Sequence, residues 1–232
     1  MKILKRILVL LLSLALLTAA LCGCGGGKSK AADSLTVGIA QDLDDSLDPH
    51  KMTAAGTREI LFNVFEGLVK PDPDGNLIPA VASDYTIADT GDTFTFTLRE
   101  GVKFHDGSTV TVGDVVYSIS RVAGLETGEP LIAAFKAVES VEATDDQTVV
   151  IKTAEPYLEF LSYLTAAIIP EGSDPADGLI GTGPYKFVSR AAQENIVLAR
   201  FDEGFEAGGG ELRRAHEKDA VSLLQALLSP RG

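Results

Sequence analysis

The expected fold follows from residues 93–108, whose sequence is TFTFTLREGVKFHDGS. Phe94, Phe96 and Leu98 alternate with threonines, which predicts a strand that buries one of its faces. Asp106 and Gly107 then predict a turn, because aspartate hydrogen-bonds nearby backbone and glycine accepts a positive φ. A strand and a tight turn are therefore the first parts of the domain that the sequence indicates.

A helix is expected directly after this turn. Thr111 and Asp114 have the spacing of a capping box, in which a hydroxyl and a carboxylate bond the free backbone amides of a helix start. Apolar residues at helical spacing follow on one stripe, namely Val112, Val115, Val116, Ile119 and Val122. The pattern predicts an amphipathic helix with one buried side.

Further elements are expected on both sides of this unit. Towards the N-terminus the patterns predict a strand over 35–39, an acidic loop over 42–49, a helix over 60–68 and a turn over 71–76. Towards the C-terminus they predict a hairpin of residues 138–143 and 148–153, a short helix over 156–164, and strands over 185–189 and 195–201. This order of elements indicates a mixed α/β or α+β body.

The N-terminus has the three regions of a secretory signal. Three basic residues lie within residues 1–6, and an uncharged run over residues 7–21 leads to small residues. A permanent membrane anchor is the alternative, but the run is shorter than the roughly 20 residues of a spanning helix unless the following glycines are counted. A disulfide between Cys22 and Cys24 is disfavoured, because the two residues are too close for an ordinary bridge.

The sequence LCGC over residues 21–24 resembles the bacterial lipobox. The resemblance implies cleavage before Cys24 and lipidation of its sulfur. We therefore expect a lipoprotein signal peptide over 1–23 and a glycine-rich flexible tether over 24–34. The protein would then be lipid-anchored at the cell membrane, facing the extracellular space or the periplasm.

Charge and composition disfavour several functions. The chain has 33 Asp and Glu against 20 Lys and Arg, whereas nucleic-acid backbones select clustered basic side chains. His50, His105 and His216 lack the spacing of metal ligands, so neither a metal nor a cofactor is expected. Without a Gly-x-Ser-x-Gly elbow or a cysteine beyond the signal region, the chain is not expected to be an enzyme, although paired carboxylates stay open as an alternative.

Several further motifs accompany residues 93–108 in a fixed order. They are Ser46-Leu47-Asp48-Pro49-His50, Phe65-Glu66-Gly67-Leu68, Pro79-Ala80-Val81-Ala82, Asp114-Val115-Val116-Tyr117-Ser118, Arg121 and Gly181-Thr182-Gly183-Pro184-Tyr185. Together these motifs closely resemble the signature of the family 5 extracellular solute-binding proteins, the receptors of peptide, nickel and related ABC importers. The resemblance covers residues 35–201 and implies the first lobe of a two-lobed, type II periplasmic-binding-protein fold.

The resemblance also implies where a ligand would lie, because ligands of this family bind in a cleft between two lobes that close around them. The residues expected to border the cleft come from the loop after the first strand and from the glycine-rich segment: Asp42, Leu43, Asp44, Asp45, Gly183 and Tyr185. The alternative for both segments is a solvated loop without a ligand. The other signature residues are expected to serve turns, caps and strand surfaces.

The resemblance ends before the chain does. Family members are substantially longer, and residues 202–232 do not follow the family's continuation into a second lobe. We expect lobe I over 35–201, a largely missing second lobe, and a divergent tail over 202–232 that is either disordered or helical. The alternatives are a frameshifted or truncated gene, an incomplete assembly, and a short form that a partner completes.

The expected function is that of the substrate-binding subunit of an ABC importer. A monomer would capture di- or oligopeptides outside the cytoplasmic membrane and deliver them to a permease, while separate subunits hydrolyse ATP. Its expected partners are therefore the peptide or other small solute, the permease and ATPase subunits, and the membrane through the lipid anchor. Peptide is preferred by analogy with the family. The alternatives are a receptor for nickel or another small solute, a non-functional remnant, and a secreted lipoprotein enzyme.

Overall fold

In the computed structural model, which describes residues 43–44 and 46–201, the alternating stretch forms strand β4 (Thr93–Leu98). Phe94 and Phe96 are fully buried, and Leu98 at the end of the strand is buried too. Thr97, which lies between Phe96 and Leu98, is exposed. Full burial of such a side chain contributes about 1.5–3 kcal/mol relative to its exposure to water. Burial of every second residue confirms the strand that the sequence predicted.

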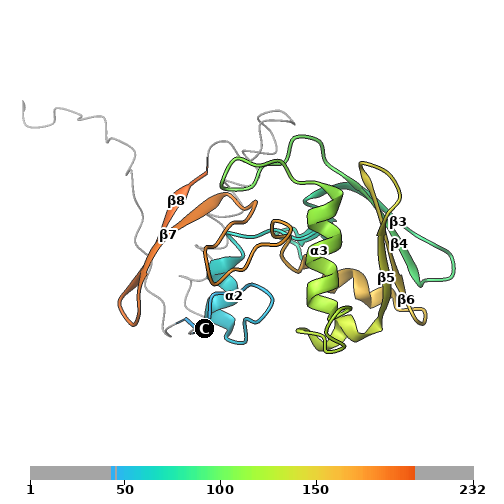
Figure 1. Ribbon diagram of the computed structural model, residues 1–232, viewed down its shortest axis with the longest axis horizontal. Helices are drawn as coiled ribbons and strands as arrows, with labels where there is room; N and C mark the ends of the chain where they lie inside the picture. The colour runs from blue at the N-terminus through green and yellow to red at the C-terminus, as the bar shows by residue number, and fades with distance from the viewer. Residues whose placement is uncertain (1–42, 45, 202–232) are drawn as a thin grey trace, which may run out of the picture. The chain divides into compact units, whose positions relative to one another are not determined.

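Strand β4 lies inside a four-stranded antiparallel sheet of order β3-β4-β6-β5. Its neighbours are β3 (Ala82–Ile87) and β6 (Thr148–Thr153), and β6 in turn pairs with β5 (Val138–Ala143). The hairpin of β5 and β6 is confirmed with the bounds that the sequence predicted. In Figure 1 helix α3 lies along one face of this sheet, where its residues contact β5 and β6.

Helix α3 (Val112–Ala123) begins at the predicted capping box. The side chain of Thr111 accepts from the amide of Asp114, and the carboxylate of Asp114 accepts from the amide of Thr111 at 2.7 Å, which confirms the capping box. Gly124 ends the helix in the left-handed region, with a φ of 65°. Val115, Ile119 and Val122 of the predicted stripe are fully buried in the core between helix and sheet.

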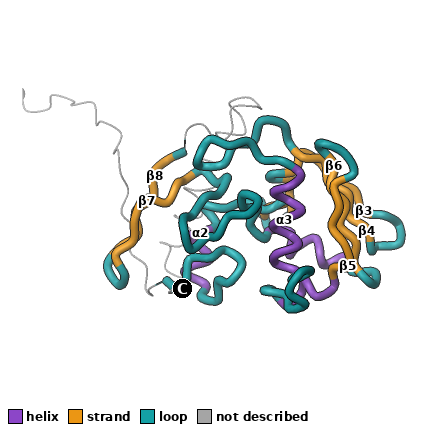
Figure 2. The backbone as a smooth tube through the Cα atoms, in the orientation of Figure 1, coloured by secondary structure: helices purple, strands orange, loops and turns teal. Residues whose placement is uncertain are grey.

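The other described elements are short. They are helix α2 (Ala55–Leu61), strands β1 (Val69–Pro71) and β2 (Leu77–Pro79), the 3₁₀ helices η1 (Ala133–Ala137) and η2 (Leu158–Thr165), and strands β7 (Tyr185–Ala191) and β8 (Asn195–Arg200). Figure 2 shows how much loop connects them. The turn expected over 71–76 joins β1 to β2, and β7 and β8 form a two-stranded antiparallel ribbon. The mixed fold class is thus confirmed.

One expectation about local structure is wrong. The helix expected over 60–68 is α2, which ends at Leu61. Leu61, Val64 and Phe65 pack in a second apolar cluster, whereas Leu68 belongs to the main core. The apolar spacing therefore arises because the chain passes between two cores. The expected strand over 35–39 and the tail over 202–232 lie outside the described residues.

Strand β3 was not expected from the sequence. It lies at the edge of the sheet and exposes Ser83, Asp84 and Thr86 to water. Its register with β4 shifts between Ala82 and Asp84, which inserts an extra residue into the alternation. Because β3 is an edge strand with an irregular register, its apolar and polar residues alternate only weakly. The sequence therefore does not show the alternation that would have predicted this strand.

Candidate functional site

The acidic loop supports the start of helix α2. The carboxylate of Asp44 accepts from the amides of Thr53 and Ala54, at 2.9 and 3.0 Å, and from the hydroxyl of Thr53 at 3.2 Å. These hydrogen bonds, the one from Ala54 first, lower the pKa of Asp44. The amide of Asp44 donates to the hydroxyl of Thr57 at 2.7 Å. Asp44 therefore acts as a remote cap for α2.

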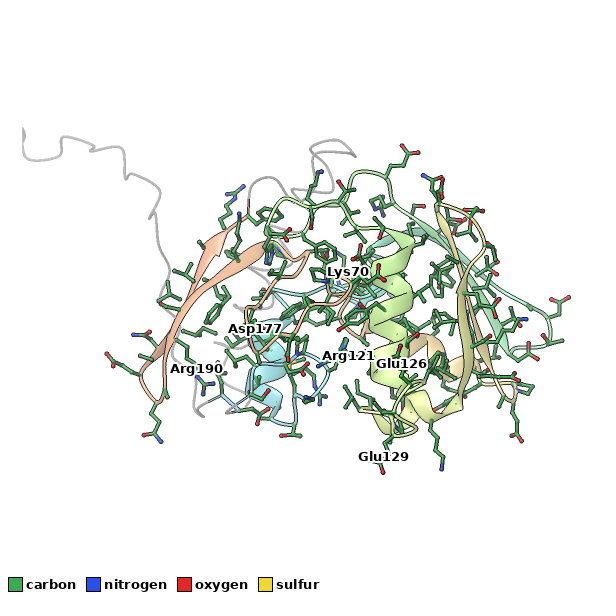
Figure 3. The ribbon with its side chains drawn as sticks, in the orientation of Figure 1. Lys70, Arg121, Glu126, Glu129, Asp177 and Arg190 are labelled. Carbon is green, nitrogen blue, oxygen red and sulfur yellow. The ribbon has the colours of Figure 1, made fainter. Side chains whose placement is uncertain are left out.

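The same loop is tied to the ribbon of β7 and β8 through Arg190, which Figure 3 labels. Arg190 Nη1 donates to the carbonyl oxygen of Asp44 at 2.6 Å, and Nη2 donates to that of Leu43 at 2.8 Å. Leu43 itself is buried. Asp42 and Asp45, the other two loop residues of the predicted site, lie outside the described residues, as does Cys24.

The glycine-rich segment packs against the chain that leaves α2. The amide of Gly183 donates to the carbonyl oxygen of Val64, and that of Tyr185 to the carbonyl oxygen of Asn63, both at 3.0 Å. A Cβ atom on Gly183 would lie 2.5 Å from the Asn63 carbonyl oxygen. Glycine is therefore required at position 183 by a close backbone approach.

The structure holds the two halves of the predicted site at opposite ends of the same elements. Asp44 bonds residues at the start of α2, whereas Gly183 and Tyr185 bond residues that follow its end. Arg190 lies five residues after Tyr185 on β7, which is about 16 Å along a strand. The loop and the glycine-rich segment can thus contact a common ligand only if that ligand is extended over such a distance.

A second polar cluster joins Asp48 of the acidic loop to Arg121, which lies on the side of α3 that faces away from the sheet (Figure 3). Arg121 donates to both carboxylate oxygens of Asp48, at 2.6 and 3.1 Å, and to Nδ1 of His50 at 2.8 Å. His50 Nε2 donates to the carbonyl oxygen of Ala167 at 2.8 Å. This cluster ties three separate segments of the chain together.

The titration of this cluster follows from its burial and its contacts. Burial lowers the pKa of His50, and the nearby charge of Arg121 lowers it further. Burial alone would raise the pKa of Asp48, but the hydrogen bonds from Arg121 and from the amide of His50 outweigh it, so the pKa is lowered. At neutral pH the cluster is therefore a neutral imidazole beside an ion pair.

Two further signature residues, Arg99 and Asp106, serve the backbone. Arg99 donates to the carbonyl oxygens of Ala80 and Ala82, both at 3.4 Å, and so joins the end of β4 to the start of β3. Asp106 accepts from the amide and the hydroxyl of Ser108, at 2.9 and 2.6 Å, within the turn that the sequence predicted. These contacts give Arg99 and Asp106 a role in the fold that needs no ligand.

His105, in the same turn, contacts the glycine-rich segment directly. Its Nε2 donates to the carbonyl oxygen of Gly183 at 2.9 Å, and the amide of Gly181 donates to its Nδ1 at 3.3 Å. This contact was not predicted, because 76 residues separate His105 from Gly181. A histidine in a turn and a distant glycine-rich segment form too general a pattern to predict that the two are in contact.

Among the described residues, no three His, Cys, Asp or Glu side chains gather in a way that could hold a metal ion. Within the same residues, no helix has the length and apolarity that a membrane span requires.

Comparison with known proteins adds a family to this geometry. The model of the bacterial extracellular solute-binding proteins, family 5 Middle, matches residues 76–213, which is more than half of the chain. The chain is 30% identical over 172 residues to the glutathione-binding protein GsiB of Pectobacterium atrosepticum, and the match covers 70% of this chain and 34% of that protein. The chain thus spans about a third of the length of the curated relatives it matches.

Two solved structures resemble the described fold. NikZ from Campylobacter jejuni, in complex with Ni(L-His), is 26% identical with a TM-score of 0.64 over 75% of this chain and 36% of that one. The ABC transporter-associated periplasmic binding protein DppA from Helicobacter pylori, in complex with the peptide STSA, is 25% identical with a TM-score of 0.61 over 71% of this chain and 38% of that one. Similar folds in this group thus bind solutes of different chemistry.

Proposed function

Because the chain belongs to the family 5 bacterial extracellular solute-binding proteins, we propose that it is the substrate-binding part of an ABC importer for di- or oligopeptides. The described residues have the fold of part of a type II periplasmic binding protein. The match over residues 76–213 carries the proposal, and the peptide complex of DppA favours a peptide as the ligand. The chain would bind its solute without chemical change.

The geometry favours an extended ligand. Leu43 and Asp44 lie near one end of β7 and Gly183 and Tyr185 lie at the other, about 16 Å apart along the strand. A peptide of five extended residues spans about this distance. We propose that residues 42–45, Gly183 and Tyr185 face the ligand, within a lobe that extends over 35–201.

The proposal includes anchoring outside the cytoplasmic membrane. Residues 1–23 would be a lipoprotein signal peptide, Cys24 would carry the lipid, and residues 24–34 would be the tether. The monomeric lobe would pass its peptide to a permease whose transport separate ATPase subunits drive. Nickel held by a small organic ligand is the second candidate solute, since NikZ was solved with Ni(L-His).

A thermal unfolding experiment tests the proposed function. The full chain is heated alone, with millimolar tri-alanine or penta-alanine, with glutathione, and with Ni²⁺ plus L-histidine. A ligand that binds the native state at 100 times its Kd stabilises that state by about 2.7 kcal/mol and raises the midpoint. We expect penta-alanine to raise the midpoint most. A shift with Ni²⁺ and L-histidine alone, or no shift with any solute, would contradict a peptide receptor.

Matched variants locate the effect. Tyr185→Ala should reduce the shift caused by penta-alanine, whereas Leu158→Ala, at a residue of η2 with 61% of its surface exposed, should leave it unchanged. Equal loss in both variants would place the ligand elsewhere.

A further inference from the structure

We propose that His105 positions the glycine-rich segment Gly181–Tyr185 for ligand binding, and that it does so only as a neutral imidazole. The segment's role towards a ligand rests on the proposed function. The contacts that hold the segment do not, because they are made between residues of the chain itself.

The first argument is the direction of the hydrogen bonds. The Gly181 amide donates to Nδ1 of His105, so this nitrogen carries no proton. The Gly183 carbonyl oxygen can only accept, so Nε2 must carry the proton that it donates at 2.9 Å. The amide of His105 also donates to the Gly181 carbonyl oxygen, at 2.9 Å. One neutral tautomer therefore satisfies both ring contacts, and neither the other tautomer nor the cation does.

The second argument is that the imidazole is itself held in place. Its ring meets the ring of Phe201 edge to face, with 4.9 Å between the centroids. Lys186 Nζ donates to the His105 carbonyl oxygen at 3.2 Å and lies 4.4 Å from the centroid of Phe201. The turn is closed by the bonds between Asp106 and Ser108. The imidazole is therefore presented to the segment by a fixed turn and a packed ring.

The third argument concerns Thr182, between the two glycines. Thr182 is 4% exposed, and its hydroxyl finds no hydrogen-bond partner in the described part of the chain. A buried hydroxyl without a partner is unfavourable, so the observed conformation of the segment needs support from outside. His105 gives this support on one side, and the carbonyl oxygens of Asn63 and Val64 give it on the other.

Charged groups of the described residues act on His105 from more than one element. Lys186 on β7 opposes protonation, whereas Glu66 and Asp106 favour it. Burial is the largest influence and lowers the pKa of His105 below its ordinary value. The imidazole is therefore neutral at pH 7. When acid protonates Nδ1, two donors face each other at Gly181, and the clamp on the segment opens.

The test combines a measurement without ligand and one with it. In the full chain, ¹⁵N NMR of the imidazole should report the Nε2-protonated tautomer at pH 7, and His105→Leu should speed hydrogen exchange of the Gly181 amide at least tenfold. With penta-alanine as the probe, binding to the natural chain should weaken severalfold as His105 titrates below pH 6.5. His105→Gln keeps a donor for Gly183 but does not titrate, so its binding should stay constant from pH 7 to 5.

The controls separate this inference from the proposed function. His216→Gln removes another imidazole and should keep the pH dependence of the natural chain. If penta-alanine never binds, the proposed function fails, while the tautomer and the exchange of Gly181 still decide whether His105 holds the segment. The inference is overturned by a protonated His105 at pH 7, by unchanged Gly181 exchange in His105→Leu, or by a pH dependence of binding that persists in His105→Gln.

Discussion

Replacing Arg121 with methionine should destabilise the fold by about 3 kcal/mol, because it leaves a buried carboxylate without its main partner. Asp48 is 5% exposed and receives two hydrogen bonds from Arg121, at 2.6 and 3.1 Å. Removing one partner of a buried pair costs roughly 3–5 kcal/mol. The lower end applies because the Arg121 side chain is 18% exposed and Lys51 Nζ stays 3.4 Å from Asp48.

The assay is urea unfolding of the full chain at pH 7.5, which gives the free energy of unfolding. In a separate thermal unfolding experiment the midpoint should fall by roughly 6–12 °C. The pairing is tested by making Asp48→Asn both in the natural chain and in Arg121→Met, where it removes the unpaired carboxylate charge. The double variant should then lose less stability than the sum of the two single variants. A loss below about 1 kcal/mol for Arg121→Met would refute the reasoning, since exposed ion pairs give values of that size.

The pH dependence of the same variant has a definite sign. In the natural chain the pKa values of His50 and Asp48 are lowered on folding. As the pH falls, the unfolded state therefore binds more protons than the folded state, and the free energy of unfolding decreases. The contribution of His50 is lost as the pH falls below its ordinary value of 6.5, and that of Asp48 below 3.8. Without Arg121, His50 can take up a proton beside Asp48. The loss caused by Arg121→Met should therefore be smaller at pH 5.5 than at pH 7.5, and an equal loss would contradict the assigned tautomer.

Three further predictions use the same unfolding assay or a simple fractionation. Thr111→Ala removes the cap of α3 and should cost about 1 kcal/mol, whereas Thr111→Ser should cost little. Gly183→Ala places a Cβ 2.5 Å from a carbonyl oxygen and should cost about 1–3 kcal/mol, whereas Gly56→Ala, in open space on α2, should not destabilise. Cys24→Ser should abolish labelling by radioactive palmitate and release the protein from membranes, and Cys22→Ser should do neither.

Much of the sheet could be predicted because its local signals agree with its packing. The alternation of β4 and the bounds of β5 and β6 follow from buried apolar side chains that are separated by intermediate or exposed ones. The capping box of α3 is a local device whose residues are three positions apart, so no tertiary knowledge was needed. The end of α2 at Leu61 could not be predicted, because it depends on which of two apolar clusters receives each later residue.

The site was less accessible to sequence reasoning, because most of its contacts use the backbone. Gly183 and Tyr185 are held by carbonyl oxygens of Asn63 and Val64, and any residue type supplies such an oxygen. His105 meets Gly183 across 78 positions of sequence. What the sequence does show is the glycine itself, whose lack of a Cβ permits the approach. The resemblance to a family indicated the glycine-rich segment, whereas the residues that hold it by hydrogen bonds are known only from the structure.

The contacts of Asp44 limit how the acidic loop can take part in binding. Both of its carboxylate oxygens accept hydrogen bonds from Thr53, and one also accepts from the amide of Ala54. A ligand amino group at this carboxylate would compete with the start of α2, and each hydrogen bond to a charged group that it displaced would cost about 1.5–3 kcal/mol. Tyr185, whose amide is bonded but whose ring is half-buried, pays no such cost. If the two halves of the site share a peptide, the aromatic end should therefore contribute more of the binding free energy than the acidic end.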